Sequence, residues 1–116
     1  MCLNGEFYSL YLRKSLYNFK TALEQLDAQI LFDLVLKPIL GITDLRNDSR
    51  IDYLPGKKDA IALKEKMDSQ NFEVAFGMVP ITINEMKNIA DEGLKMPPKS
   101  TYIEPKLRSG LTIYDF

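Results

Sequence analysis

The chain has 116 residues, with 15 lysines and arginines against 16 acidic residues, no histidine, no tryptophan and one cysteine. This length fits a single domain, residues 1–116, and 46% hydrophobic with 27% charged residues is a globular composition. Without histidine there is no Ser-His-Asp triad and no histidine metal ligand, and one cysteine cannot form an internal disulfide or a CxxC zinc site. A formal net charge of -1 disfavours general nucleic-acid binding but leaves a local basic patch open.

The sequence has no segment that resembles a membrane span or a signal peptide. Its longest mostly apolar stretch, residues 28–42, is interrupted by Gln29, Asp33, Lys37 and Pro38, and it falls short of the roughly 20 apolar residues that a spanning helix needs. The N-terminus has no basic segment followed by a long apolar core. We therefore expect a cytoplasmic protein without membrane contact.

The first twelve residues predict a β-hairpin. Asn4-Gly5 is the residue pair of a type I′ turn, Met1–Leu3 precede it as the end of one strand, and residues 6–12 form the return strand. Both faces of that return strand are apolar, which predicts cover on two sides. Because only three residues precede the turn, we expect the chain to be the C-terminal fragment of a longer protein.

The next predicted elements are helical. Residues 13–26 form a connector with a short helix, and Asp27 is the expected N-cap of a helix over 28–40 that ends at Gly41. Apolar residues cover most of the circumference of this helix, so it is predicted to be buried and central. Pro38 is expected to kink it or end it early.

The second half alternates strands and helices around recognisable end signals. A polar loop at 44–50 precedes a short strand at 51–54 and a turn at Pro55-Gly56. A helix over about 57–69, a strand over 73–79, a helix over 83–92 and a final strand over 111–114 follow. Thr82 and Glu85 have the spacing of a capping box, and Gly93 marks the end of the 83–92 helix. In the 57–69 helix the residues expected to face inward are Ala60, Ile61, Leu63 and Met67. The predicted fold is α+β, a small mixed sheet with about three helices.

The segment over residues 95–110 is the strongest candidate for a binding site. It is basic and proline-rich, and hydroxyl side chains interleave with its cations. Such a loop can neutralise a phosphate or carboxylate and donate several hydrogen bonds to it, although a solvated connecting loop has the same composition. The GxxxxGK[ST] spacing of a Walker A loop is absent. The predicted anion-binding residues are Lys99, Ser100, Thr101, Lys106 and Arg108.

Three other features invite weaker functional interpretations. The charges alternate in sign over Asp44, Arg46, Asp48, Arg50 and Asp52, a spacing that could place the three carboxylates around a metal. They lack the glycine and distal glutamate of an EF-hand loop, and a salt-bridged surface loop is the favoured interpretation. Asp91-Glu92 could form an acid–base pair, but adjacent helical residues point about 100° apart. Cys2 is expected to be a packed thiol rather than a nucleophile. The sequence thus predicts no catalytic residue and no metal site.

The chain resembles the C-terminal third of a widespread bacterial and archaeal family, the domain of unknown function 1015. The resemblance is carried by the runs LGITDLRNDSRIDY (40–53), FEVAFGMVPITINEMKNIADEG (72–93) and MPPKSTYIEPKLRSGL (96–111). The last run is similar to the family's terminal signature and includes Lys99, Ser100, Thr101, Lys106 and Arg108. The family's longer members imply that an N-terminal domain is missing here.

The resemblance also suggests where any chemistry would lie. The family's N-terminal part resembles ParB/sulfiredoxin-like domains with an Asp-Gly-His-His-Arg motif, and some relatives of that fold are nucleotide-using enzymes, free-serine kinases among them. Because this chain has no histidine, catalysis and a nucleotide cofactor would belong to that missing part. The chain itself is expected to be an accessory module for a phosphate-bearing small molecule or nucleotide. The alternative is a structural domain that packs on the N-terminal half or forms a homo-oligomer, and nucleic-acid binding ranks last.

Overall fold

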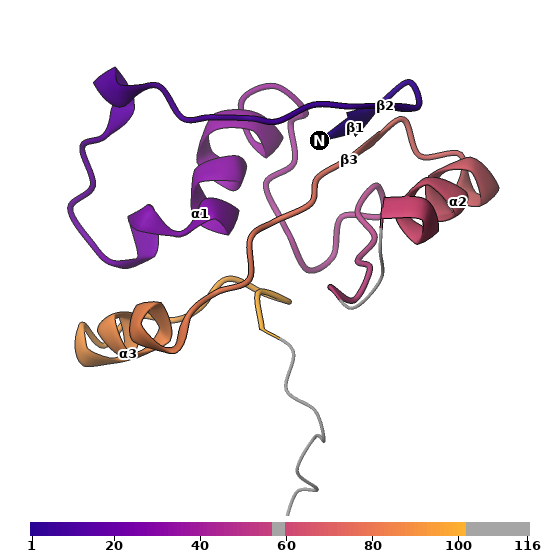
Figure 1. Ribbon diagram of the computed structural model, residues 1–116. Helices are drawn as coiled ribbons and strands as arrows, with labels where there is room; N and C mark the ends of the chain where they lie inside the picture. Colours follow the sequence, from indigo (N-terminus) through magenta and orange to yellow (C-terminus); the bar gives the residue numbers. More distant parts are fainter. Residues whose placement is uncertain (57–59, 102–116) are drawn as a thin grey trace, which may run out of the picture.

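The computed structural model describes residues 1–56 and 60–101. It contains a three-stranded sheet in the order β2-β1-β3 and three α-helices, which confirms the predicted α+β class (Figure 1). Both neighbours of β1 run antiparallel to it, so the described sheet is antiparallel rather than mixed. The bounds are β1 Cys2–Leu3, β2 Glu6–Phe7, β3 Val74–Ala75, α1 Asp27–Leu31, α2 Ala60–Gln70 and α3 Ile83–Asp91.

The N-terminal hairpin forms as predicted but is shorter. Asn4 and Gly5 both have positive φ, 52° and 78°, as a type I′ turn requires. Beyond β2, the Tyr8 amide donates to the Met1 carbonyl and the Met1 amino group donates to the Tyr8 carbonyl, each at 2.8 Å. The predicted strand over 6–12 is reduced to β2, Glu6–Phe7, and residues 8–12 have no regular secondary structure.

The predicted helix over 28–40 is divided, and it is not buried. Leu26 rather than Asp27 is the N-cap, α1 ends at Leu31, and a π-helical turn Phe32–Leu36 continues it. Proline has no amide hydrogen and its ring clashes with the carbonyl four residues earlier, so Pro38 is incompatible with a regular continuation. Gly41, at φ 64°, ends the segment as predicted. No residue of α1 or of the π-helical turn is buried, which corrects the predicted central helix.

The connecting segments differ from the predicted pattern in several places. Two short 3-10 helices, Lys14–Leu16 and Leu23–Gln25, occupy the connector before α1. The predicted strand over 51–54 is irregular, and the strand over 73–79 shortens to β3. In α2, Met67 is buried and Leu63 half-buried as predicted, but Ala60 and Ile61 are exposed. The predicted strand over 111–114 lies outside the described residues.

Few side chains are buried in the described part of the chain. The buried hydrophobic residues come one each from β1, the N-cap of α1, the segment after the π-helical turn, α2 and α3: Cys2, Leu26, Ile42, Met67 and Ile89. The burial of Cys2 confirms the predicted packed thiol. Among the helices of residues 1–56 and 60–101, none combines the length and apolarity that a bilayer crossing requires.

The start of α3 is a capping box, as the sequence predicts. The Thr82 hydroxyl accepts from the Glu85 amide at 3.2 Å, and the Glu85 carboxylate accepts from the Thr82 amide at 2.7 Å. The Thr82 hydroxyl also donates to the Glu85 carboxylate at 2.7 Å, and this bond, together with the one from the Thr82 amide, lowers the pKa of Glu85. Thr82→Ala is therefore expected to cost about 1 kcal/mol in the free energy of unfolding, measured by urea denaturation. Thr43→Ala, at an exposed site away from a helix start, is the control, and an equal loss in both variants would contradict a capping role.

Candidate anion-binding groove

Two segments that are about 50 residues apart in the sequence meet at a groove of about 390 Å³. The first is the loop that follows the π-helical turn, and the second is the proline-rich segment after α3. The lining residues are Leu45, Arg46, Ile51, Tyr53, Pro98 and Lys99. The groove therefore joins the two charged segments that the sequence singled out separately.

The first wall is a loop that closes on itself. The Tyr53 hydroxyl donates to the Leu45 carbonyl at 2.8 Å, which links the two ends of the loop. At the start of the loop, one Asp44 carboxylate oxygen accepts from the amides of Arg46 and Asn47 at 2.8 and 3.2 Å. The Asn47 side chain, more than any other group, lowers the pKa of Asp44. These bonds fix the backbone that carries Arg46.

A second group of bonds holds this loop against the end of the preceding helical segment. Arg50 contacts both carboxylate oxygens of Asp48, at 2.9 and 2.6 Å. The same guanidinium donates to the carbonyls of Leu40 and Gly41, at 2.9 and 3.2 Å. The hydrogen bonds from Arg50 to the Asp48 carboxylate lower the pKa of Asp48 from 3.8 to about 2. The planar fork of arginine suits such a set of acceptors, which the single ammonium of lysine could not reproduce.

Helix α2 supports the far end of the loop. The Lys66 ammonium lies 2.6 Å from the Asp52 carboxylate and donates to the Tyr53 carbonyl at 3.2 Å. The hydrogen bond from Lys66 is the main cause of the lowered pKa of Asp52, and burial raises the pKa of Tyr53. The aromatic ring of Tyr53 is thus positioned from both ends of the residue, at its backbone and at its hydroxyl.

Lys99 and Pro98 form the other wall. Lys99 has φ 59°, a backbone conformation in which residues other than glycine, asparagine and aspartate are rare. The adjacent Ser100 hydroxyl donates to the Pro97 carbonyl at 2.6 Å, which closes a tight turn around the lysine. Lys99 is exposed, so its ammonium is accessible from solvent.

Two cations line the groove, and the charge of one of them, Arg46, also contributes to the lowered pKa of Asp44. Arg46 and Lys99 are exposed, and neither side chain forms an ion pair or a hydrogen bond within residues 1–56 and 60–101. The half-buried side chains of Leu45, Ile51 and Pro98 supply an apolar surface beside them. Among the described residues, those that line the groove include no acidic one. The arrangement suits an anion attached to an apolar or planar body.

The structure distributes the predicted anion-binding residues unevenly. Lys99 lines the groove, Ser100 uses its hydroxyl hydrogen within the turn, and Thr101 is exposed without a hydrogen bond in the described part of the chain. Lys106 and Arg108 lie outside the described residues. Arg46 and Tyr53 line the groove but were not predicted as binding residues, because nothing in their spacing relates residues 44–53 to residue 99.

The weaker candidates have structural roles. Asp48 pairs with Arg50 and Asp52 with Lys66, which confirms the salt-bridged loop, and no group that could hold a metal lies within the described ranges. The Glu92 carboxylate accepts from the Ala22 amide at 3.0 Å and so connects α3 to the N-terminal part. Glu92 therefore has a structural contact at the end of α3, where the sequence favoured a solvated helix end over an acid–base pair.

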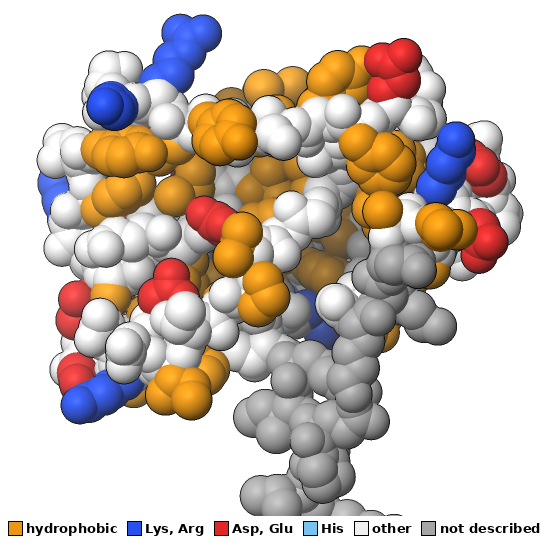
Figure 2. Space-filling model, in the orientation of Figure 1, with side chains coloured by type: hydrophobic (Ala, Val, Ile, Leu, Met, Phe, Trp, Pro, Cys, Tyr) orange, Lys and Arg blue, Asp and Glu red, His pale blue; other side chains and the backbone are white. Residues whose placement is uncertain are grey.

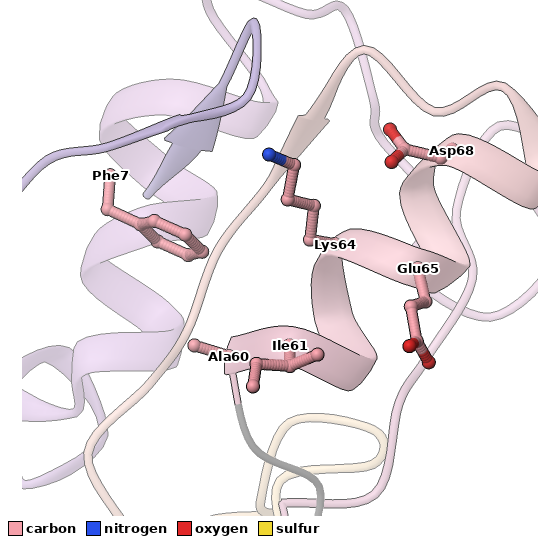
Figure 3. A pocket seen from close by; sticks show the side chains of 6 residues that line it. All are labelled: Phe7, Ala60, Ile61, Lys64, Glu65 and Asp68. Carbon is pink, nitrogen blue, oxygen red and sulfur yellow. The ribbon is translucent and has the colours of Figure 1, made fainter.

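A second depression, of about 210 Å³, lies between the hairpin and α2. In Figure 3 the Phe7 ring turns toward Ala60, while the Lys64 side chain extends from α2 toward the hairpin. Its remaining lining residues are Ile61, Glu65 and Asp68. Two carboxylates and one ammonium surround a small apolar surface, so this depression has no excess of positive charge for an anion.

No family model matches the chain, and no curated protein or solved structure is similar to it.

Proposed function

We propose that this domain is a binding module for a phosphate-bearing small molecule or a nucleotide. The ligand would lie in the groove between residues 45–53 and 98–99. The observation that carries the proposal is that Arg46 and Lys99 line one groove and that neither forms an ion pair or a side-chain hydrogen bond with a described residue. The described residues that line the groove include no acidic one. Exposed cations usually face solvent on convex surfaces, where nothing concentrates their charge on one ligand. A groove that holds two of them attracts anions more strongly.

The two cations would divide recognition between them. Arg46 would bind two phosphate oxygens through its guanidinium, and Lys99 would act as a point charge on a third. The ring of Tyr53 and the apolar side chains of Leu45 and Ile51 would contact the body that carries the phosphate. Lys106 and Arg108, which lie outside the described residues, stay part of the proposed set of cations.

The proposal agrees with the resemblance to the domain of unknown function 1015. We propose that the chain is the C-terminal part of such a protein and that catalysis, with its nucleotide, belongs to the missing N-terminal domain. The module described here would then hold one end of the ligand.

Titration with pyrophosphate, followed by calorimetry, tests this function. Arg46→Gln and Lys99→Gln are each expected to weaken binding about tenfold, because a hydrogen bond to a charged group contributes roughly 1.5–3 kcal/mol. Affinity should also fall as the salt concentration rises. Glutamine at position 99 keeps a side chain of similar length on the same backbone.

A matched control distinguishes binding in the groove from a general effect of net charge on affinity. Lys20→Gln/Lys87→Gln removes two exposed positive charges away from the groove and should leave affinity nearly unchanged. The Arg46→Gln/Lys99→Gln double variant makes the same change in net charge and should abolish measurable binding. Equal affinity in the two double variants would refute the proposal.

A second function, as an interaction domain, is favoured by the exposed apolar surface. Figure 2 shows hydrophobic side chains that reach the surface over much of the visible face. Four of the large exposed ones follow closely in the sequence: Phe7, Tyr8, Leu10 and Tyr11. Large hydrophobic side chains that are exposed close together are typical of a surface that contacts a partner.

A further inference from the structure

Within the part of the chain that the structure describes, no strand pairs with the outer edge of the N-terminal hairpin. In the order β2-β1-β3, β2 is an edge strand, and residues 8–13 continue beyond it without regular structure (Figure 1). Figure 1 shows this stretch running along one side of the molecule. Within the described ranges, the backbone groups of residues 9–12 form no hydrogen bond.

The direction of the backbone groups on this edge follows from the hairpin. Tyr8 exchanges both of its backbone hydrogen bonds with Met1, so its amide and carbonyl face β1. Backbone groups alternate in direction along an extended strand. Those of Phe7, and those of Ser9 and Tyr11 where the chain stays extended, therefore face away from β1 and are free to pair.

The side chains of this edge are large and apolar. Phe7 and Leu10 are each 54% exposed, and Tyr11 is 88% exposed. A long apolar edge of this kind is a template for another strand, and monomeric proteins usually protect it with charges, proline or a bulge. Residues 7–12 contain no charged residue and no proline.

Charges stand only at the two ends of the segment, and their signs differ. Glu6 begins it, and Arg13, still extended with φ -67° and ψ 136°, ends it before Lys14 starts a 3-10 helix. If two copies of the segment pair antiparallel, the acidic end of each lies beside the basic end of the other. Parallel pairing would place like charges together, so the charges favour an antiparallel partner of the same sequence.

We propose that the occupant of this edge is a second copy of the chain, paired antiparallel through residues 6–12. The two sheets would then form one continuous sheet around a two-fold axis, in a closed, isologous dimer. This inference gives the interaction role a partner and does not depend on anion binding, because no groove residue lies in the segment.

The direction of the backbone groups restricts the register. In an antiparallel ladder, the backbone amides and carbonyls of two opposed residues must either both point toward the other strand or both point away from it. Centring the pair on Ser9 meets this condition, uses residues 6–12 throughout, and sets Phe7 opposite Tyr11 of the second copy. Centring it on Leu10 also meets the condition, but it sets Glu6 opposite Lys14, which has already left the extended conformation. The structure therefore favours the pairing of Ser9 with Ser9.

Sedimentation of the 116-residue chain across a dilution series, with two variants of Ser9, tests the dimer. The unmodified chain and Ser9→Thr should both sediment as dimers. Ser9→Pro removes the outward-facing amide while breaking no bond to β1, and it should give a monomer with an unchanged circular dichroism spectrum. A monomeric or open-ended aggregating parent, or a dimeric Ser9→Pro variant, would overturn the proposal.

Cross-linking then tests the register. Opposed residues of a hydrogen-bonded pair lie about 5.5 Å apart at Cα, within the range of a disulfide. Oxidised Ser9→Cys should therefore run as a covalent dimer on a non-reducing gel, whereas Thr43→Cys, exposed elsewhere, should not. Equal cross-linking of both variants would contradict the register. Pyrophosphate titration of the Ser9→Pro monomer keeps the two proposals distinct, since its affinity should equal that of the parent.

Discussion

Replacing Ile89 with alanine is expected to lower the free energy of unfolding by about 2–5 kcal/mol. Ile89 is only 1% exposed, and it is the one buried residue of α3. Removing its side chain loses apolar burial and leaves a cavity where few other buried residues could compensate. A typical domain is stable by about 5–15 kcal/mol, so this single change would remove a large part of the total. Urea denaturation measures the loss.

Helix α3 offers a matched control in Ile83. It has the same side chain, lies on the same helix and is 79% exposed. Ile83→Ala makes the same change in helix propensity and should alter the free energy of unfolding by no more than about 0.5 kcal/mol. Equal losses in the two variants would mean that α3 does not pack through Ile89.

Arg50→Met is expected to lower the free energy of unfolding at neutral pH. It should also make that free energy depend less on pH in the acid range. The folded protein holds the pKa of Asp48 at about 2, below its ordinary value of 3.8, mainly through the hydrogen bond from Arg50. A carboxylate whose pKa is lowered by folding stabilises the folded state above its unfolded pKa. That contribution is fully present above about pH 4 and is lost as the pH falls toward 2.

Unfolding measured from pH 7 down to pH 2 checks this expectation. The difference between the parent and Arg50→Met should narrow toward the acid end, because protonated Asp48 no longer pairs with Arg50. The part that comes from the bonds to the carbonyls of Leu40 and Gly41 should remain at every pH. Arg50→Lys keeps the charge but loses the fork that also holds the carbonyls of Leu40 and Gly41, so it should recover only part of the stability. A constant difference between parent and Arg50→Met at every pH would rule out the ion pair as the cause.

The sequence predicted those features that are determined within a few residues. The Asn4-Gly5 turn, the Thr82–Glu85 capping box and the left-handed Gly93 all appear where they were expected. Each depends on the backbone preference of one residue, or on a side chain that bonds to an amide three positions away. Such interactions form almost independently of the rest of the fold.

Burial was predicted less well because it depends on distant neighbours. The apolar pattern of residues 28–40 predicts a central helix, but no residue of α1 or of the π-helical turn is buried, and Ile39 is 70% exposed. In α2, Ile61 was expected to face inward but is exposed. Hydrophobic periodicity shows which residues share a face, but it does not show whether another element lies against that face.

One side of the candidate groove, at Lys99, was predicted as a binding site, and the other side, at residues 45–53, was not. Lys99 was identified because a basic, proline-rich loop is unusual in composition. Arg46 was assigned to a salt-bridged loop, yet its neighbours Asp48 and Asp52 pair instead with Arg50 and Lys66. The choice among several possible ion pairs depends on three-dimensional placement, which alternating charges alone do not specify.

Two contacts described above join distant parts of the chain. The Glu92–Ala22 hydrogen bond connects residues 70 positions apart, and β1 pairs with β3 across a similar separation. Closing loops of this length costs conformational entropy before either contact can repay it, and folding slows as the sequence separation of native contacts grows. Despite its small size and three helices, the domain should therefore fold more slowly than a helical bundle of equal length.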